Sequence, residues 1–165
     1  MIKDYSFLWG SSTKWKKVFF DLLDNWWKSQ RTKELIAKGS KRYNEASLTE
    51  SLSEYLKKRL KQFDIPDSKP HDSSTVPDIR IRAQAGLIRE IYEDAIEVKR
   101  GLSSTNEENR LFGQISKYCT KYNHCFVVIC GGDIRSGLVT EVHRNLKEDN
   151  RKITAIWTPD KNLRF

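Results

Sequence analysis

The chain has no long apolar run and only three cysteines, and these absences exclude several classes of protein. No segment of its 165 residues is apolar over the length needed to cross a bilayer, and Met1-Ile2-Lys3-Asp4 is unlike a secretory leader. Cys119, Cys125 and Cys130 form no Cys-x-x-Cys pair, so neither a disulfide framework nor a zinc site is indicated. We therefore expect a cytoplasmic protein without membrane contact.

Nucleotide-binding and histidine-based motifs are also missing. Gly131-Gly132-Asp133 fits neither a P-loop nor a dinucleotide fingerprint, and Asp133 would repel an anion, so this stretch predicts a turn. His71, His124 and His143 are single residues in different segments. The sequence therefore gives no reason to expect a histidine metal site.

The charge is the first positive indication. The 30 Lys and Arg exceed the 22 Asp and Glu, giving a net charge of +8, and such an excess favours polyanionic partners, DNA first among them. Residues 1–70 hold 15 basic and 9 acidic residues, whereas residues 71–165 hold 15 and 13. We expect phosphate contacts mainly from Lys38, Lys41 and Arg42 in a basic linker and from the Lys57–Lys61 face.

Two helices are predicted before the middle of the chain. Residues 11–28 place apolar side chains at helical spacing from Trp15 to Trp26, which suits the core, a subunit interface or contact with DNA. A second helix from Asn44 to about Phe63 buries a leucine stripe, and Glu45 falls on that stripe at its N-terminal end. A carboxylate there needs a partner, although the helix dipole alone also favours it.

Three of the charged residues in the stretch from Val76 to Lys99 indicate a metal site, and they are Asp78, Glu97 and Lys99. In Ala95-Ile96-Glu97-Val98-Lys99 the strand period places Glu97 and Lys99 on one face. If the strand after Pro77-Asp78 pairs with this one, Asp78 comes beside Glu97, and two close carboxylates repel unless a cation lies between them. Mg²⁺ prefers such oxygen ligands, while a neighbouring ammonium can offset charge in a transition state.

Pro77-Asp78 followed by Glu97-Val98-Lys99 resembles the motif of the PD-(D/E)XK nuclease superfamily. The resemblance implies a DNA endonuclease, restriction-like or structure-selective, with an α/β/α sandwich around a mixed sheet over residues 44–165 and a helical extension over residues 1–43. It implies Mg²⁺, for which Mn²⁺ can substitute, held by Asp78, Glu97, the Val98 carbonyl and Glu45, with Lys99 positioning water. An inactive nucleic-acid-binding module of the same fold is the alternative. Because one site cuts one strand, we expect a homodimer through the Trp15–Trp26 stripe.

The segment between the two halves of the motif is longer than the simplest hairpin. Residues 83–86 and Glu93-Asp94 resemble turns, which would leave residues 87–92 as an extra strand. Glu93 or Asp94 would then be alternative ligands, but neither has a lysine two residues later, so Glu97 is preferred.

A helix from about Glu107 to Tyr122 follows the motif and carries two more candidates. Gln114 and Tyr118 resemble the extra Gln-x-x-x-Tyr motif of the recombination-exonuclease branch of the superfamily. This implies that Gln114 holds a metal-bound water or a phosphate and that Tyr118 stacks on a base, with Arg100 contacting nucleic acid nearby. A surface glutamine and a core tyrosine remain the alternative. The run Phe126–Cys130 predicts a central strand, residues 133–147 a helix and Ile153–Trp157 a terminal strand.

Overall fold

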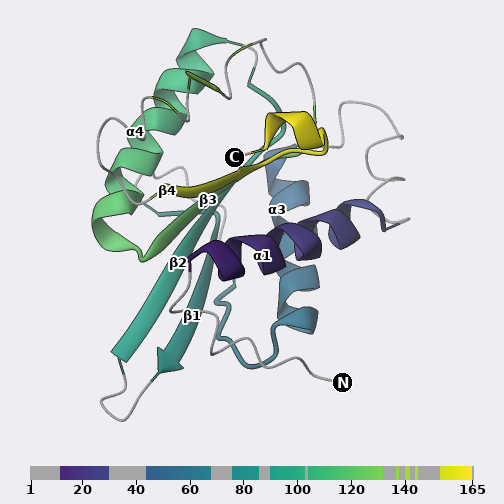
Figure 1. Cartoon of the computed structure of the whole chain (residues 1–165), viewed down its shortest axis with the longest axis vertical. Coiled ribbons are helices and arrows are strands. Elements are labelled where there is room, and N and C mark those ends of the chain that lie inside the picture. The colour runs from purple at the N-terminus through teal and green to yellow at the C-terminus, as the bar shows by residue number, and fades with distance from the viewer. Residues whose placement is uncertain are drawn as a thin grey trace.

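The computed structural model of the chain is an α/β structure with helices on both faces of a mixed sheet (Figure 1). It describes residues 12–29, 44–67, 76–85, 90–102, 104–131 and 153–164, together with positions 137, 140, 141 and 144. The helices are α1 (Ser12–Trp27), α3 (Glu45–Arg59), α4 (Thr105–Lys121) and the short 3-10 helix η2 (Lys161–Leu163), and the strands are β1 (Ile79–Ala85), β2 (Glu90–Lys99), β3 (His124–Ile129) and β4 (Ile153–Trp157).

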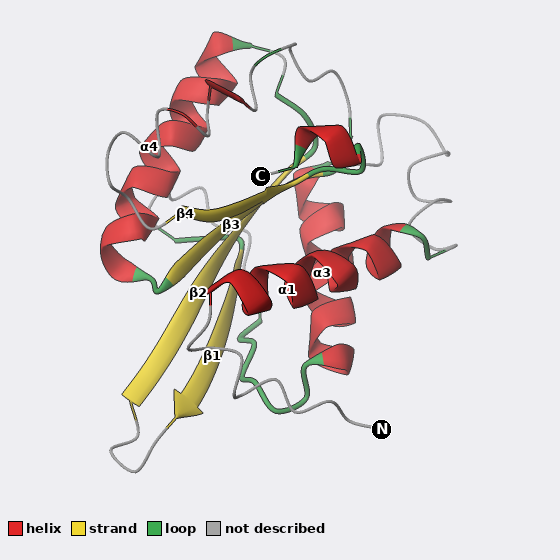
Figure 2. Cartoon of the chain, in the orientation of Figure 1, coloured by secondary structure: helices red, strands yellow, loops and turns green. Residues whose placement is uncertain are grey.

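The four strands lie in the order β1-β2-β3-β4 (Figure 2). β1 and β2 are antiparallel, with Ile79 opposite Ile96, while β2, β3 and β4 are parallel to one another. Parallel neighbours require a crossover, and α4 provides it between β2 and β3. The mixed sheet predicted from the sequence is confirmed, and so are the central and terminal strands.

The first face of the sheet packs against α1 and α3. Side chains of alternating strand residues point to this face and form the larger hydrophobic core with both helices. The strand residues buried there are Ile79, Ile81, Ala83, Ile96, Val98, Phe126, Val128, Ala155 and Trp157. α3 begins after the N-cap Asn44, whose side chain accepts a hydrogen bond from the Ser47 backbone, and its leucine stripe is buried as predicted.

The aromatic stripe of α1 belongs to this core. Trp15, Phe19 and Trp26 are fully or almost fully buried, and Phe19 packs on Phe126 with ring centroids 4.3 Å apart. The prediction that this stripe forms a dimer interface is therefore wrong, because the sheet of the same chain already covers it. α1 shares one core with the sheet, and the stripe gives no reason to expect a dimer.

A cluster near the end of the described chain also holds α1 in place. Arg164 makes two hydrogen bonds to the Asp24 carboxylate, of 3.0 and 2.6 Å, and Trp157 Nε1 donates to the same carboxylate over 3.0 Å. The guanidinium carbon of Arg164 lies 5.1 Å from the centroid of the Trp157 ring. Asp24 thus connects α1 to two residues near the end of the described chain.

The second face of the sheet is covered by α4. Leu111 and Ile115 pack on Val127, Ile129 and Ile156, which alternate with the strand residues of the first face. The helix begins with a capping box, in which Ser104 and Glu107 exchange hydrogen bonds between side chain and backbone. This capping fixes where α4 starts relative to the end of β2.

The interpretation of Glu93-Asp94 as a turn is wrong, because β2 continues through both residues. Glu93 is paired with Arg82 on β1, and the buried Asp94 accepts hydrogen bonds from two side chains of other elements. Two polar residues are therefore accommodated inside one long strand, and there is no separate strand at residues 90–92. The hairpin of β1 and β2 extends beyond the helices (Figure 2).

Several expectations fall outside the described ranges. Residues 133–147, predicted as a helix, are mostly among them, as are Lys38, Lys41 and Arg42. Within the ranges that the structure describes, no helix is both long and apolar enough to cross a membrane.

Candidate functional site

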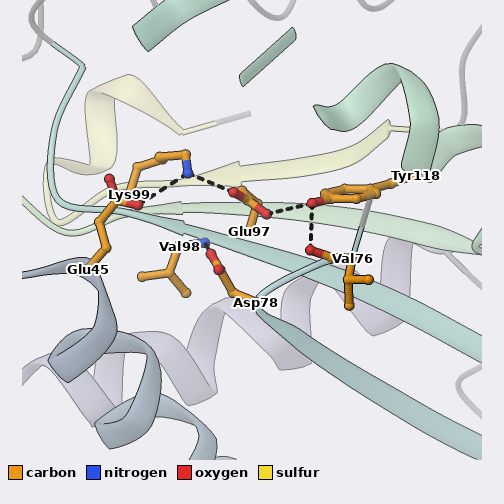
Figure 3. A network of polar contacts seen from close by, with 7 residues as sticks. All are labelled: Glu45, Val76, Asp78, Glu97, Val98, Lys99 and Tyr118. Atoms are coloured by element: carbon orange, nitrogen blue, oxygen red, sulfur yellow. Dashed lines mark hydrogen bonds and ion pairs between the residues drawn. The ribbon is translucent and has the colours of Figure 1, made fainter. Parts of the chain in front are cut away.

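The strand pairing brings Asp78 to β2, as the sequence predicts. Asp78 directly precedes β1, whose first residue Ile79 lies opposite Ile96, so Asp78 comes level with the following residues of β2. Its Oδ2 accepts a hydrogen bond of 2.7 Å from the Val98 backbone N–H (Figure 3). This bond fixes the Asp78 carboxylate beside the Glu97-Val98-Lys99 segment.

Glu97 is held from two sides. It is 2% exposed and points to the α4 face of the sheet. Its Oε1 accepts a hydrogen bond from Lys99 Nζ at 2.6 Å, and its Oε2 lies 3.1 Å from the Tyr118 hydroxyl (Figure 3). The orientation of the Glu97 carboxylate is therefore set by one residue of its own strand and one residue of α4.

Lys99 connects two carboxylates. Its ammonium lies 2.6 Å from Glu97 Oε1 and 3.2 Å from Glu45 Oε2, where Glu45 is the first residue of α3. Burial on its own lowers the pKa of Lys99, but the charges of Glu97, Glu45 and Asp78 outweigh burial and leave that pKa above its usual value. Lys99 is therefore an ammonium at neutral pH and acts through its charge and hydrogen bonds, since it has no free lone pair with which to accept a proton.

The surroundings of Lys99 favour its charged form, whereas those of Asp78 favour its neutral form. Burial and the nearby charge of Glu97 raise the pKa of Asp78 to about 7, although the Val98 hydrogen bond and Lys99 act the other way. The charge of Glu97 contributes to this rise after burial, so a cation beside the two carboxylates would favour the ionised form of Asp78.

The Val98 carbonyl points toward the same edge of β2 as Asp78. The Lys99 carbonyl accepts a hydrogen bond of 2.7 Å from Cys130 N on the β3 side. Successive residues of a strand direct their backbone groups to opposite edges, so the Val98 groups point away from β3. The predicted metal-binding role of the Val98 carbonyl is consistent with this direction.

Gln114 carries an unsatisfied acceptor. It is 5% exposed, and its Oε1 is buried without a hydrogen-bond partner in the described part of the chain. It lies one helical turn before Tyr118 on the same face of α4. Since α4 runs antiparallel to β2, this turn brings Gln114 to the level of Lys99. An amide oxygen accepts hydrogen bonds, so Oε1 suits a water molecule better than a phosphate oxygen.

Tyr118 does not serve the predicted role. It is 1% exposed, so it cannot stack on a nucleic-acid base. Its hydroxyl lies 3.0 Å from the Val76 carbonyl oxygen and 3.1 Å from Glu97 Oε2 (Figure 3). Tyr118 instead joins the segment that leads into Pro77-Asp78 to Glu97. The helical spacing of Tyr118 with Leu111 and Ile115 already indicated a buried residue, but its polar partners come from the fold.

Two predicted site residues remain, Glu45 and Arg100. Glu45 contacts Lys99, and the described residues contain no group of three His, Cys, Asp or Glu side chains arranged to hold a metal ion. The geometry therefore does not join Glu45 to Asp78 and Glu97 as a third metal-binding carboxylate. Arg100 is exposed at the end of β2, and its contact with nucleic acid stays a prediction.

A hard cation nevertheless fits part of this donor set. Asp78 and Glu97 provide carboxylate oxygens, Val98 a carbonyl in the same direction, and Gln114 an unsatisfied oxygen at the level of Lys99. Asp78 Oδ1 accepts no hydrogen bond from the residues that the structure describes. Asp78 and Glu97 are therefore the residues that could hold such an ion, while Lys99 and Glu45 pair with each other nearby.

Comparisons with known proteins add no family to this description. No protein-family model, no curated protein and no solved structure matches the chain.

Proposed function

We propose that this chain is a metal-dependent nuclease that hydrolyses phosphodiester bonds in DNA, with the restriction endonuclease-like arrangement of the PD-(D/E)XK superfamily. The observation that carries the proposal is the convergence of Asp78, Glu97 and Lys99 at one position of the sheet. In addition, the chain carries a net charge of +8, which suits a polyanionic substrate.

The side chains have distinct roles in this proposal. Asp78 and Glu97 provide the oxygen ligands, and the hydrogen bonds from Val98, Lys99 and Tyr118 hold those carboxylates in place before substrate arrives. Lys99 carries a positive charge beside the reacting phosphate, where negative charge develops during hydrolysis. Gln114 accepts a hydrogen bond from a water at the site. When bound, Mg²⁺ supplies Lewis-acid polarisation and lowers the pKa of bound water.

The proposal is tested by incubating the protein with supercoiled plasmid in Mg²⁺ and in EDTA. We expect nicking or linearisation with Mg²⁺ only, and loss of it in Lys99→Ala. The matched control is Lys161→Ala, which removes an exposed lysine of η2 and leaves cleavage unchanged. Cleavage by Lys99→Ala at the wild-type rate would contradict the assignment of the site.

A second candidate function is a nucleic-acid-binding module without chemistry. One observation favours it: Lys99 already lies between Glu97 and Glu45, so each of these carboxylates has an ion-pair partner without a metal ion. In that case Lys99→Ala would lower the free energy of unfolding, because it leaves two carboxylates beside Asp78 without their partner. Plasmid would be bound but not cut in any divalent metal.

A further inference from the structure

We infer that the phosphate backbone of the substrate strand lies along one flank of α4, formed by Arg110, Lys117 and Lys121 and called here the basic flank, with Arg80 of β1 on the opposite side. This inference rests on the proposed function and specifies how the substrate reaches the site. It moves the phosphate contacts away from the Lys57–Lys61 face that the sequence suggested.

The cations of α4 are gathered on one side. Arg110, Lys117 and Lys121 are its only basic residues, and all three are exposed. At about 100° per residue they fall within an arc of about 40°. Lys117 and Lys121 are one turn apart, where like charges destabilise a helix. A polyanion along this flank would relieve that repulsion.

The basic flank lies on the side of α4 that faces the candidate site. On the other side of the helix, Phe112, Ile115 and Cys119 pack against the cluster that contains Ile129 and Leu163. Tyr118 lies between the two sides and reaches Glu97 and Val76. The flank beyond Tyr118 therefore faces the β1 edge, where Asp78 is found.

Along the helix axis, the basic flank extends past the site in both directions. The contact with Tyr118 fixes the level of Glu97 on α4. At 1.5 Å per residue, Lys121 lies about 4.5 Å beyond that level and Arg110 about 12 Å before it. A backbone that contacts both residues passes through the site instead of ending in it. This geometry favours cleavage within a strand.

Arg80 extends the positive surface on the β1 side. It lies opposite Ala95, so both point to the α4 face, and Ala95 packs with Tyr118 and Tyr122. Burial and Glu93 raise the pKa of Tyr122, and the charges of Arg80 and Arg82 partly oppose that rise. Arg82 is paired with Glu93, whereas Arg80 has no ion pair with a residue of the described ranges.

The test compares two triple substitutions with the same change of charge. Arg110→Gln, Lys117→Gln and Lys121→Gln remove the basic flank, while Lys58→Gln, Arg59→Gln and Lys61→Gln remove exposed cations of α3 and the turn after it. Both sets are made in the Asp78→Asn background, and binding of labelled single-stranded and duplex oligonucleotides is measured by fluorescence anisotropy at increasing NaCl concentration.

We expect the α4 set to flatten the slope of log affinity against log salt by about two to three on duplex and about two on single strands. The α3 set should leave both slopes unchanged. Equal flattening by the two sets, flattening by the α3 set alone, or no binding by the parent protein would overturn the inference. Plasmid cleavage is measured separately, with the wild-type protein, in which Asp78 is intact. If the α4 set flattens the salt slope but the wild type does not cut plasmid, only the proposed nuclease activity is contradicted. If the wild type cuts plasmid but the α4 set leaves the salt slope unchanged, only the proposed position of the DNA backbone along α4 is contradicted.

Discussion

Asp94 and Glu97 are two carboxylates of one strand, both hidden from solvent, and they lie in different chemical surroundings. Asp94 faces α1 and accepts hydrogen bonds from Trp15 Nε1 at 2.7 Å and from His124 Nδ1 at 2.8 Å. Glu97 faces α4, where Lys99 and Tyr118 hold it beside a second carboxylate, that of Asp78. Burial therefore does not distinguish a structural acid from a candidate ligand, but a second acid nearby does.

The largest expected effect is on cleavage by Glu97→Gln. The amide retains the shape of the carboxylate but removes its charge, so we expect the cleavage rate to fall by about a thousandfold, and the loss of the ion pair with the buried Lys99 to lower the free energy of unfolding. Single-turnover cleavage and urea denaturation measure the two effects. Glu50→Gln, an exposed residue of α3, is the matched control and should cleave normally. Normal cleavage by Glu97→Gln would remove the contrast with Asp94.

The second prediction concerns Asp94→Ala. This change leaves the buried indole N–H of Trp15 without its acceptor and breaks the contact with His124, so we expect a loss of about 3 kcal/mol in the free energy of unfolding. The cleavage rate of the folded fraction should stay near that of the wild type. Denaturant titration checks the first part, and cleavage at low temperature checks the second. A stable but inactive variant would place Asp94 in the site.

These two predictions also separate what the sequence reveals from what it does not. The spacing Glu97-Val98-Lys99 after Pro77-Asp78 was enough to identify one face of one strand, since alternation is local. The role of Glu93 and Asp94 was missed because two adjacent acidic residues are as typical of a turn as of a strand whose polar side chains have partners. The partners Arg82, Trp15 and His124 come from other parts of the sequence and are known only from the fold. The burial of α1 was left open for the same reason: an apolar stripe does not tell which surface covers it.

The third prediction uses the pKa of Asp78, which the fold raises from 3.8 to about 7. The folded chain holds this proton more tightly than the unfolded chain, so the contribution of Asp78 to stability falls as pH rises from about 4 to about 7. Asp78→Asn removes this penalty. In EDTA we expect the variant to be more stable than the wild type at pH 8, by up to about 4 kcal/mol, and equal to it near pH 4.

Addition of Mg²⁺ completes this test. The ion should raise the melting temperature of the wild type by binding the folded state, and should not raise that of Asp78→Asn. An Asp78→Asn variant that is less stable than the wild type at pH 8 would mean that the carboxylate serves the fold, as Asp94 does. Thermal denaturation at the two pH values provides all of these comparisons.

The smallest effect is expected for Tyr118→Phe, which deletes only the hydroxyl between Glu97 and Val76. Glu97 then loses one of its two orienting contacts, so we expect kcat to fall about tenfold, with little change in KM, and stability to fall by about 1 kcal/mol. Tyr122→Phe, at the C-cap of the same helix, is the matched control. Equal losses in both variants would show that the contact of the Tyr118 hydroxyl with Glu97 has no specific role.

The Asp24 cluster has a consequence for how the chain is made. Asp24 and Arg164 are 140 residues apart in sequence, and at about 5–20 residues per second the ribosome takes about 7–30 s to supply the second after the first. β1, β2 and β3 are synthesised earlier, but β4 with Trp157, which packs on Trp26 and Trp27, comes only shortly before Arg164. Until that segment has been synthesised, the tryptophans at the end of α1 lack one of their packing partners, and completion of this part of the core depends on the residues that carry Trp157 and Arg164.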